Sequence, residues 1–476
     1  MNVLNDIQPK EVLRFFEAIC DLPHGSRNTK VLSDFCVVFA RLRGLWCHQD
    51  KANNVIIRKE ASLGYEDHPP VIIQGHLDMV CERDAGVEID FRRDGLRLTA
   101  DGDYIRAQGT TLGADNGIAV AYALALLDDK NLVHPPLEVL LTSDEEIGML
   151  GAMALDVSPL KGKTLINLDS DVEGVLTLGC AGGLKGDLLL PLRRESVTGT
   201  PYTLQVTGLT GGHSGVEIGC GRTNAITFVA SLFDKLCAKV DARPFGFTGG
   251  GKDNAIPRTA TLKFLCPTPL SEEALALVSE AERTLRETEP NAAVTLTAGN
   301  PTSQGALTRD CRDRMLELFR RVPNGVQKMS EALPDMVETS LNLGIISFEK
   351  SLCATFALRS NVNAELEALS AGISALAKEL GAQWRTGAAY PAWEMREHSP
   401  LRDTMVEVWR TMFGGTPRTE TIHAGLECGV FADKIKGLDC VSMGPTMLDI
   451  HTPREALSIS STERTWRYLL AILKAL

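Results

Sequence analysis

The sequence lacks a long apolar run: its longest, at 118–127, is far short of the ~20 residues that a membrane helix needs. It also lacks paired cysteines, because the 12 cysteines are spread singly and form no C-x-x-C pair. That spread favours reduced thiols in a cytosol over a disulfide framework. Positive charge is in deficit, since 49 Lys and Arg face 61 Asp and Glu and leave a net charge of −12. This balance argues against nucleic acid and anionic membrane as partners.

The N-terminal stretch lacks the basic-then-apolar layout of a secretion signal, so we expect a cytoplasmic protein. The remaining composition is ordinary, with 44% hydrophobic and 23% charged residues, as in folded globular proteins. A chain of 476 residues exceeds what one compact core usually contains, so two domains are expected.

Two patterns of hydrophobicity divide the chain. Up to about residue 186, continuous apolar strands such as 71–74 alternate with helices, which predicts an α/β domain with a mostly parallel sheet flanked by helices. The next part has strands that alternate polar and apolar residues, as at 202–207, which predicts an α+β domain with one solvent-facing sheet surface. The C-terminal part returns to the first pattern. We therefore expect a catalytic domain formed by 1–186 and 389–476, with a domain of 187–388 inserted into it.

Histidine and acidic residues gather where the buried strands end. They are His76 and Asp78 after the first strand, Asp115 before an apolar helix, Asp144, Glu145 and Glu146 after the next strand, and Asp169 and Asp171 after a further one. Each group alone could be a helix cap or a solvated loop. Open α/β sheets, however, bind ligands beyond the carboxyl ends of their strands, and adjacent carboxylates repel unless a cation compensates. Together, the groups favour a metal site.

Three further segments contain candidate functional residues. His451 follows an apolar strand at 439–443 that would rejoin the same sheet, so it could be a ligand or a surface residue. The stretch 246–252 has the spacing of a phosphate-binding loop, but Asp253 follows its lysine and no apolar strand precedes it, which excludes nucleotide binding. Ser214 lacks a G-x-S-x-G elbow, which disfavours a serine hydrolase.

The motifs GHLDMV, TLGADNG, SDEEIG, NLDSD and DIHTPRE, in this order, resemble those of the dinuclear zinc metallopeptidases related to carboxypeptidase G2. Within that group, GLTGGHSG, HAGLECG and the long inserted domain are most similar to the bacterial aminoacyl-histidine dipeptidases, the cytosolic non-specific dipeptidases. The resemblance covers essentially the whole chain. It implies hydrolysis of dipeptides with free termini, including the Xaa-His type, by a water held between two zinc ions. Carboxylate-rich sites of this kind also accept manganese or cobalt.

The resemblance also implies a role for each site residue. The metal ligands would be His76 and Asp169 on one ion, Glu146 and His451 on the other, and Asp115 bridging both. The peptide bond between Asp115 and Asn116 would be cis. Glu145 would act as the catalytic general base. Asp78 would orient His76 through the second ring nitrogen of the imidazole.

Four residues at or beyond the inserted domain are implied to act on the substrate. His213 would stabilise the oxyanion, either in its own subunit or across a homodimer formed through the inserted lid domain. Asn254 and Arg359 would hold the substrate backbone and its terminal carboxylate, for which a planar guanidinium is well suited. Gly425 would bring backbone close to the substrate.

Alternative functions stay open at this point. An N-acyl amino acid deacylase or a tripeptidase could use the same metal site. A metal-binding protein without turnover is disfavoured by Glu145, since a structural zinc site closes its coordination sphere and needs no spare base. The sequence assigns no role to His423 or Glu427, and it does not define the side-chain preference of the substrate.

Overall fold

The structure is a computed structural model that describes residues 3–331 and 333–476. The chain forms two compact units. The first unit comprises 1–180, 393–421 and 426–476, and the second comprises 181–392 and 422–425. The main boundaries lie close to the expected 186/187 and 388/389. The segment 422–425 differs from the expectation, because it belongs to the inserted unit although the flanking chain belongs to the first.

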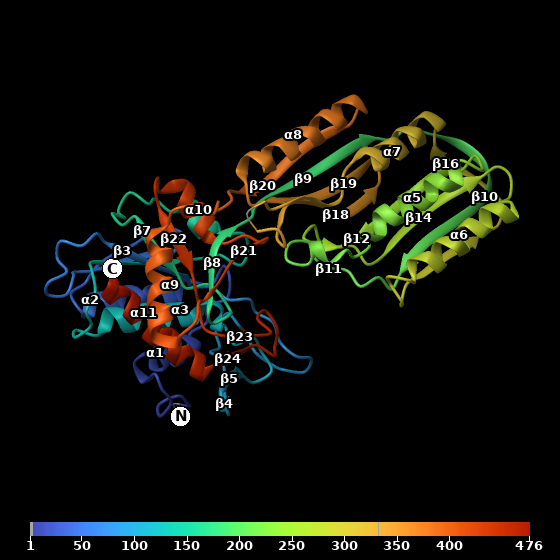
Figure 1. Ribbon diagram of the computed structural model, residues 1–476. Coiled ribbons are helices and arrows are strands. Elements are labelled where there is room, and N and C mark those ends of the chain that lie inside the picture. The colour runs from blue at the N-terminus through green and yellow to red at the C-terminus, as the bar shows by residue number, and fades with distance from the viewer. Residues whose placement is uncertain (1–2, 332) are drawn as a thin grey trace. The chain divides into compact units, whose positions relative to one another are not determined.

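An eight-stranded sheet forms the centre of the first unit, and Figure 1 labels its strands β3, β7, β22, β8 and β21. The strand order is β1-β2-β6-β3-β7-β22-β8-β21. Its strands are β1 (Trp46–Gln49), β2 (Val55–Lys59), β3 (Val71–His76), β6 (Leu137–Thr142), β7 (Thr164–Asn167), β8 (Val175–Cys180), β21 (Arg418–Ile422) and β22 (Asp439–Ser442). The central strands β6, β3, β7 and β22 are parallel, whereas β1, β2 and β6 pair antiparallel, as do β22 and β8. The predicted α/β class is confirmed, with the parallel strands at the centre of the sheet.

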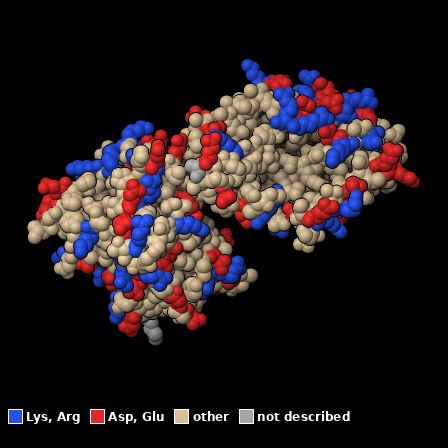
Figure 2. Space-filling view, in the orientation of Figure 1, with Lys and Arg blue, Asp and Glu red and all other residues tan. Residues whose placement is uncertain are grey.

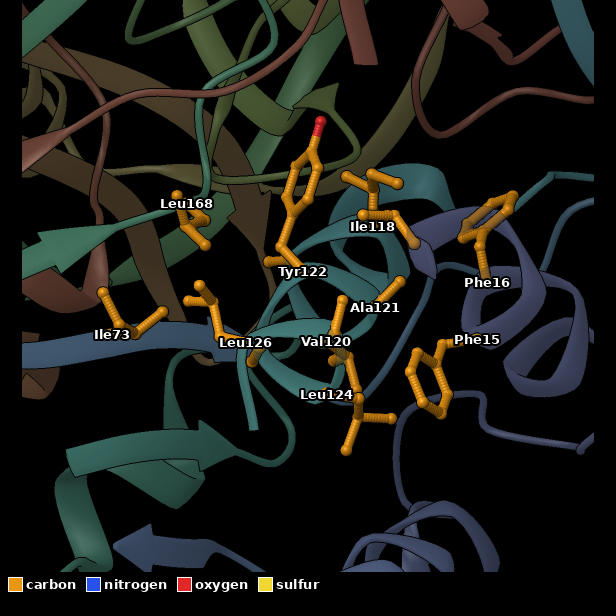
Figure 3. Packing of buried hydrophobic residues seen from close by; sticks show 14 of the residues in the cluster. Phe15, Phe16, Ile73, Ile118, Val120, Ala121, Tyr122, Leu124, Leu126 and Leu168 are labelled. Atoms are coloured by element: carbon orange, nitrogen blue, oxygen red, sulfur yellow. The ribbon is translucent and has the colours of Figure 1, made fainter. Parts of the chain in front are cut away.

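Helix α3 (Ala114–Asp128) is buried on all sides in the first unit. Figure 3 shows Phe16 of α1 on one side of it and Ile73 of β3 on another. Within the same core, Tyr122 of α3 stacks on Trp466, with ring centroids 5.9 Å apart. The other helices of this unit are α1 (Lys10–Cys20), α2 (Lys30–Leu42), α4 (Leu150–Ala154), α9 (Pro400–Phe413), α10 (Glu427–Lys434) and α11 (Ile459–Ala475). Burial of this apolar helix fixes its first residues at the carboxyl edge of the sheet.

A small antiparallel sheet joins the C-terminal chain to the first third of the sequence. Its order is β23-β24-β5-β4, with β4 (Leu98–Asp101), β5 (Tyr104–Ala107), β23 (Met447–Leu448) and β24 (Ala456–Ser458). The loop between β23 and β24 contains His451. Both ends of that loop are therefore anchored by strand pairing.

The second unit is an antiparallel sheet covered on one face by helices (Figure 1). Its main path runs β15-β10-β14-β12-β18-β19-β9-β20, with β16 paired to β10 and β17 to β18. The strands are β9 (Gly182–Pro191), β10 (Arg194–Thr207), β12 (Arg243–Gly250), β14 (Ala260–Cys266), β15 (Ala293–Ala298), β16 (Thr302–Leu307), β17 (Gly325–Met329), β18 (Val337–Phe348), β19 (Ser351–Ser360) and β20 (Gln383–Tyr390). The helices are α5 (Ala225–Cys237), α6 (Glu272–Leu285), α7 (Arg309–Arg321) and α8 (Asn363–Glu379).

Charged side chains of both signs are interspersed on the face shown in Figure 2. The net charge of −12 is therefore not concentrated in one acidic patch on that face. Within residues 3–331 and 333–476, no helix combines the length and apolar character that crossing a membrane requires.

Candidate metal centre

The predicted ligands meet at the carboxyl edge of the central sheet. Strands β6, β3 and β7 are neighbours and run parallel, so the loops that follow them leave at the same edge. His76 ends β3, Glu146 follows β6 and Asp169 follows β7. The start of helix α3 brings Asp115 to the same edge, where its Oδ1 lies 3.2 Å from Nε2 of His76. The strand ends predict a site at this edge of the sheet, and the resemblance implies which of its residues are ligands.

The two carboxylate oxygens of Asp115 face different histidines. Its Oδ1 lies 3.2 Å from Nε2 of His76, and that nitrogen lies 3.4 Å from Oδ1 of Asp169. Its Oδ2 lies 3.1 Å from Nε2 of His451, and that nitrogen lies 2.9 Å from Oε1 of Glu146. Asp115 thus stands between two similar groups, each with one histidine and one further carboxylate.

The chemistry of these groups fits a divalent cation. Carboxylates and imidazoles are the ligands that zinc and manganese take in proteins. The Oε1 atom of Glu146 accepts no hydrogen bond from the described residues despite its proximity to His451. Burial, reinforced by the carboxylates of Asp115 and Glu146 and opposed by His76, raises the pKa of Asp169 to about 7. Such crowding of acids is relieved when a cation neutralises them.

Asp78 contacts both His76 and the acidic loop after β6. The Nδ1 atom of His76 lies 2.9 Å from the main-chain carbonyl of Asp78, whereas the Asp78 carboxylate is 3.6 Å away. The carboxylate accepts the backbone N–H groups of Glu145 (2.9 Å) and Glu146 (3.3 Å), and the hydroxyl of Ser26 (2.8 Å). Both the main-chain carbonyl and the carboxylate of Asp78 therefore lie close to Nδ1 of His76, and the same carboxylate also fixes the acidic loop after β6. The role of Asp78 in orienting His76 stays a prediction.

Glu145 stands apart from the ligand contacts. Its carboxylate forms no hydrogen bond with any residue that the structure describes. Burial is the main cause that raises the pKa of Glu145 well above its ordinary value. The neighbouring carboxylates of Asp169, Glu427 and Glu146 raise this pKa further, whereas His76 lowers it. An unligated carboxyl group with a raised pKa is typical of a general acid–base residue.

A belt of buried polar side chains lies directly behind the ligands: Gln74, Thr142, Asn167 and Glu427. Oε2 of Glu427 accepts hydrogen bonds from Gln74 and Thr142, each at 2.6 Å. Gln74 in turn accepts one from Asn167. Burial raises the pKa of Glu427 to about 8, and its Oε1 accepts no hydrogen bond from the described residues. Glu427, which the sequence left unassigned, therefore belongs to the interior of this site.

In the second unit, His213 presents a defined hydrogen-bond donor. It lies on β11 (Gly212–His213), opposite β13 (Ala255–Ile256). Its Nδ1 atom accepts the backbone N–H groups of Gly215 (3.2 Å) and Val216 (3.3 Å), so the proton of the neutral ring is on Nε2. Burial, followed by the positive charge of Arg359, lowers the pKa of His213. A neutral imidazole with an Nε2–H group suits stabilisation of an oxyanion.

Arg359 of β19 is a buried cation without an acidic partner. Its side chain is 8% exposed, its Nη1 donates to the hydroxyl of Tyr390 at 2.9 Å, and no described residue forms an ion pair with it. His423 lies nearby, between the Ser340 hydroxyl (2.7 Å from Nε2) and Oδ1 of Asn361 (3.1 Å from Nδ1). Burial and then Arg359 lower the pKa of His423 to about 3. A buried guanidinium beside neutral groups calls for an anionic ligand.

Asn254 and Gly425 complete the predicted set. Asn254 is exposed, and it contacts the His213 segment through its main-chain carbonyl, which accepts the N–H of Ser214 at 2.9 Å. Gly425 is half-buried in the short 422–425 segment. That segment passes close to Gly215. A Cβ on residue 215 would lie 2.5 Å from the carbonyl oxygen of His423, so only glycine fits at this position.

Two residues that hold the ligand loops were missed by the sequence analysis. Asn116 accepts the backbone N–H of His76 at 3.1 Å and donates to the carbonyl of Leu168 at 2.8 Å. The bond between Asp115 and Asn116 is cis, as the resemblance implied. Glu455 accepts four backbone N–H groups at the start of α3. Both residues lie in motifs that were recognised, but no local pattern indicates what they contact.

Removing metal is expected to destabilise the first unit. Without a cation, the carboxylates of Asp115, Glu146 and Asp169 repel one another in a buried place. A ligand present at 100 times its Kd stabilises the folded state by about 2.7 kcal/mol. Thermal unfolding with a chelator, and after zinc is added back, should show a lower and then a restored Tm. A Tm that is the same under both conditions would contradict the metal site.

Relatives of this chain match it over nearly its whole length. Residues 72–475 match the family described as peptidase family M20/M25/M40. The chain is 37% identical to the cytosol non-specific dipeptidase of Escherichia coli K12 over 481 aligned positions, which cover 100% of this chain and 99% of that protein. The crystal structure of aminoacylhistidine dipeptidase from Vibrio alginolyticus matches with a TM-score of 0.91 and 33% identity, covering 99% of this chain and 98% of the other. The chain therefore belongs to peptidase family M20/M25/M40, a family of metal-dependent peptidases.

Proposed function

We propose that this chain hydrolyses the peptide bond of dipeptides with free termini, with broad specificity that includes Xaa-His dipeptides. The observation that carries the proposal is the convergence of two histidines and three carboxylates, with the Glu145 carboxylate close enough to interact electrostatically with His76, Asp169 and Glu146. Similarity over the full length to proteins named as dipeptidases supports the same reading.

The proposed cofactor is a pair of zinc ions, with manganese or cobalt as substitutes. His76 and Asp169 would hold one ion, Glu146 and His451 the other, and Asp115 would bridge them. Ions bound there supply the acidification of a water molecule and the polarisation of the substrate carbonyl. One histidine and two carboxylates per ion leave room for water and substrate, as catalytic sites require.

Glu145 is the proposed general base. Its carboxylate takes a proton from the attacking water as the oxygen of that water bonds to the carbonyl carbon. The same proton then passes to the nitrogen of the leaving amino acid as the C–N bond breaks. The products are two free amino acids, and Glu145 returns to its starting state. Asp78 keeps this carboxylate in place by holding the backbone of its loop.

The second unit supplies the proposed substrate contacts. Nε2–H of His213 would donate to the oxygen that becomes negative during attack, and this bond strengthens as the charge develops. The guanidinium of Arg359 would bind the free carboxylate of the dipeptide. Asn254 and Gly425 would contact the substrate backbone.

A substrate panel tests the proposal. The metal-loaded protein is assayed with a dipeptide, its N-acetylated and C-amidated forms, and a tripeptide. Cleavage of the free dipeptide should be fastest. Preference for the acetylated form would instead indicate an N-acyl amino acid deacylase, and preference for the longer peptide a tripeptidase.

Substitution of Arg359 tests carboxylate recognition. Losing a hydrogen bond to a charged partner costs about 1.5–3 kcal/mol, so Arg359→Ala should lower kcat/KM for a free dipeptide roughly 10- to 150-fold. Amidation of the dipeptide should have a similar effect on the wild type and little further effect on the variant. Arg385→Ala is a matched control, because the side chain of that exposed arginine of β20 bonds to Gln383 and, among the described residues, to no other side chain. Equal cleavage of amidated and free dipeptides by the wild type would refute this role.

Two further proposals concern the protein in the cell. We propose a cytoplasmic location, because all twelve cysteines are unpaired and the E. coli relative is named a cytosol enzyme. The homodimer through the inserted unit stays a prediction, and light scattering of the purified protein measures it.

A further inference from the structure

The buried carboxylate of Glu455 binds the chain immediately before helix α3. Its Oε2 accepts the backbone N–H groups of Leu112 (2.7 Å) and Gly113 (3.0 Å), and its Oε1 accepts those of Ala114 (2.9 Å) and Asp115 (3.2 Å). The residue is 2% exposed. Backbone N–H groups at the start of a helix have no partner within the helix, so one carboxylate satisfies four of them.

Glu455 belongs to the loop that also carries His451. The backbone N–H of Glu455 donates to the carbonyl of Thr452 at 3.0 Å, which closes a tight turn between the two residues. The next residues form β24, which pairs with β5. The carboxylate therefore links the start of helix α3 to the loop of Glu455, 340 residues away in sequence. The first segment contains the predicted ligand Asp115, and the second contains the predicted ligand His451. Those ligands, Asp115 and His451, approach to 3.1 Å.

A second buried carboxylate, that of Glu138, also accepts backbone N–H groups but lies away from the predicted ligands. Glu138 of β6 is 3% exposed and accepts the backbone N–H groups of Lys161 and Gly162 at 2.9 Å each. It lies at the start of β6, which is the end of the strand opposite to the ligands. Glu138 and Glu455 are thus alike in burial and in accepting backbone N–H groups, although Glu138 also pairs with Arg58 at 3.4 Å, and they differ in whether the bound loops carry ligands.

We propose that Glu455 is a positioning residue of the metal centre, which holds the backbone of Asp115 in register with the His451 loop before metal binds. The inference rests on the proposed metal-dependent function. Interactions of this kind behind metal ligands typically change metal affinity 10- to 100-fold. A site whose ligands are already convergent loses less conformational freedom on binding, so it binds metal more tightly.

The test compares Glu455→Gln with Glu138→Gln. In each variant one acceptor oxygen becomes an NH2 group that faces backbone donors, so both should show a lower Tm without metal. Zinc titration of metal-free protein against a chromophoric chelator should give a Kd that rises roughly 10- to 100-fold for Glu455→Gln and stays at the wild-type value for Glu138→Gln. A wild-type Kd in Glu455→Gln, with its Tm lowered, would reduce Glu455 to a structural cap and overturn the proposal.

Further measurements keep the proposal testable if Glu455→Gln does not fold. Glu455→Asp keeps the charge but is one methylene shorter and cannot reach all four N–H groups, so weaker zinc binding is expected there as well, and wild-type affinity would contradict the proposal. In the metal-free wild type, the amides of 112–115 should exchange slowly with deuterium, and rapid exchange would show that the loop is not held before metal binds. Failure of the wild type itself to bind zinc would refute the proposed function, which is a separate outcome.

Discussion

Turnover is expected to fall roughly 100-fold or more in the Glu145→Gln variant, while the metal content stays that of the wild type. Glutamine keeps the size of the side chain but cannot accept the proton of the attacking water. The metal should stay, because the close contacts among the ligands involve His76, Asp115 and Glu146 but not Glu145. Metal analysis and rate measurement on the same preparation check both parts of this expectation.

Glu146→Gln is the matched control for that experiment. It changes the adjacent residue by the same chemistry, but Oε1 of Glu146 lies 2.9 Å from Nε2 of His451 within the predicted ligand set. This variant should lose metal, and its activity should recover in part when metal is supplied in excess. Equal metal loss in both variants would mean that Glu145 is a ligand and that another group is the base.

A similarly large effect is expected for His213→Ala, in which kcat should fall about 100- to 1,000-fold, the usual result of removing one oxyanion donor. The two backbone N–H groups bound to Nδ1 leave Nε2–H as the donor. Because this hydrogen bond gains strength only as charge develops, KM should change much less than kcat. Steady-state kinetics with a free dipeptide measure the two constants separately.

The control for this prediction is His398→Ala, because the His398 side chain is 91% exposed and its contact is with the exposed Glu397. Metal content should be that of the wild type in both variants. Retention of full turnover in His213→Ala would remove the residue from the mechanism. A rise in KM alone would make it a substrate-binding group instead.

Local sequence patterns were sufficient for much of the first unit. The helical spacing of apolar residues at 10–20 and 30–42 predicts helices there, and α1 and α2 have these bounds. The apolar stretch 117–127 predicts a buried helix, and α3 begins earlier, at Ala114, because a distorted first turn with non-helical angles at Asp115 and Asn116 precedes the regular part. Helix α7 (Arg309–Arg321) was not predicted: charged residues dominate it, and it is held by a few buried side chains such as Met315.

The site was predicted as far as its residues follow strands. The strand ends pointed to groups that contain His76, Glu146 and Asp169, because parallel strands bring their following loops together, and the resemblance selected these residues as ligands. Glu455 and Glu427 could not be assigned this way, since the partners that donate hydrogen bonds to their side chains lie between 285 and 353 residues away in sequence. Contacts of that kind depend on how distant segments pack, which has no periodic signature in the chain.

The separation of the ligands along the chain also has a consequence for synthesis on the ribosome. Asp115 precedes His451 by 336 residues, so at roughly 5–20 residues per second about 20–70 s pass between their appearances. During that interval the nascent chain exposes the acidic loops without His451, and the loop of Asp115 lacks the carboxylate of Glu455. The proposed half of the site formed by Glu146 and His451 therefore assembles only after residue 451 has been synthesised, and a product that terminates before it would lack that half.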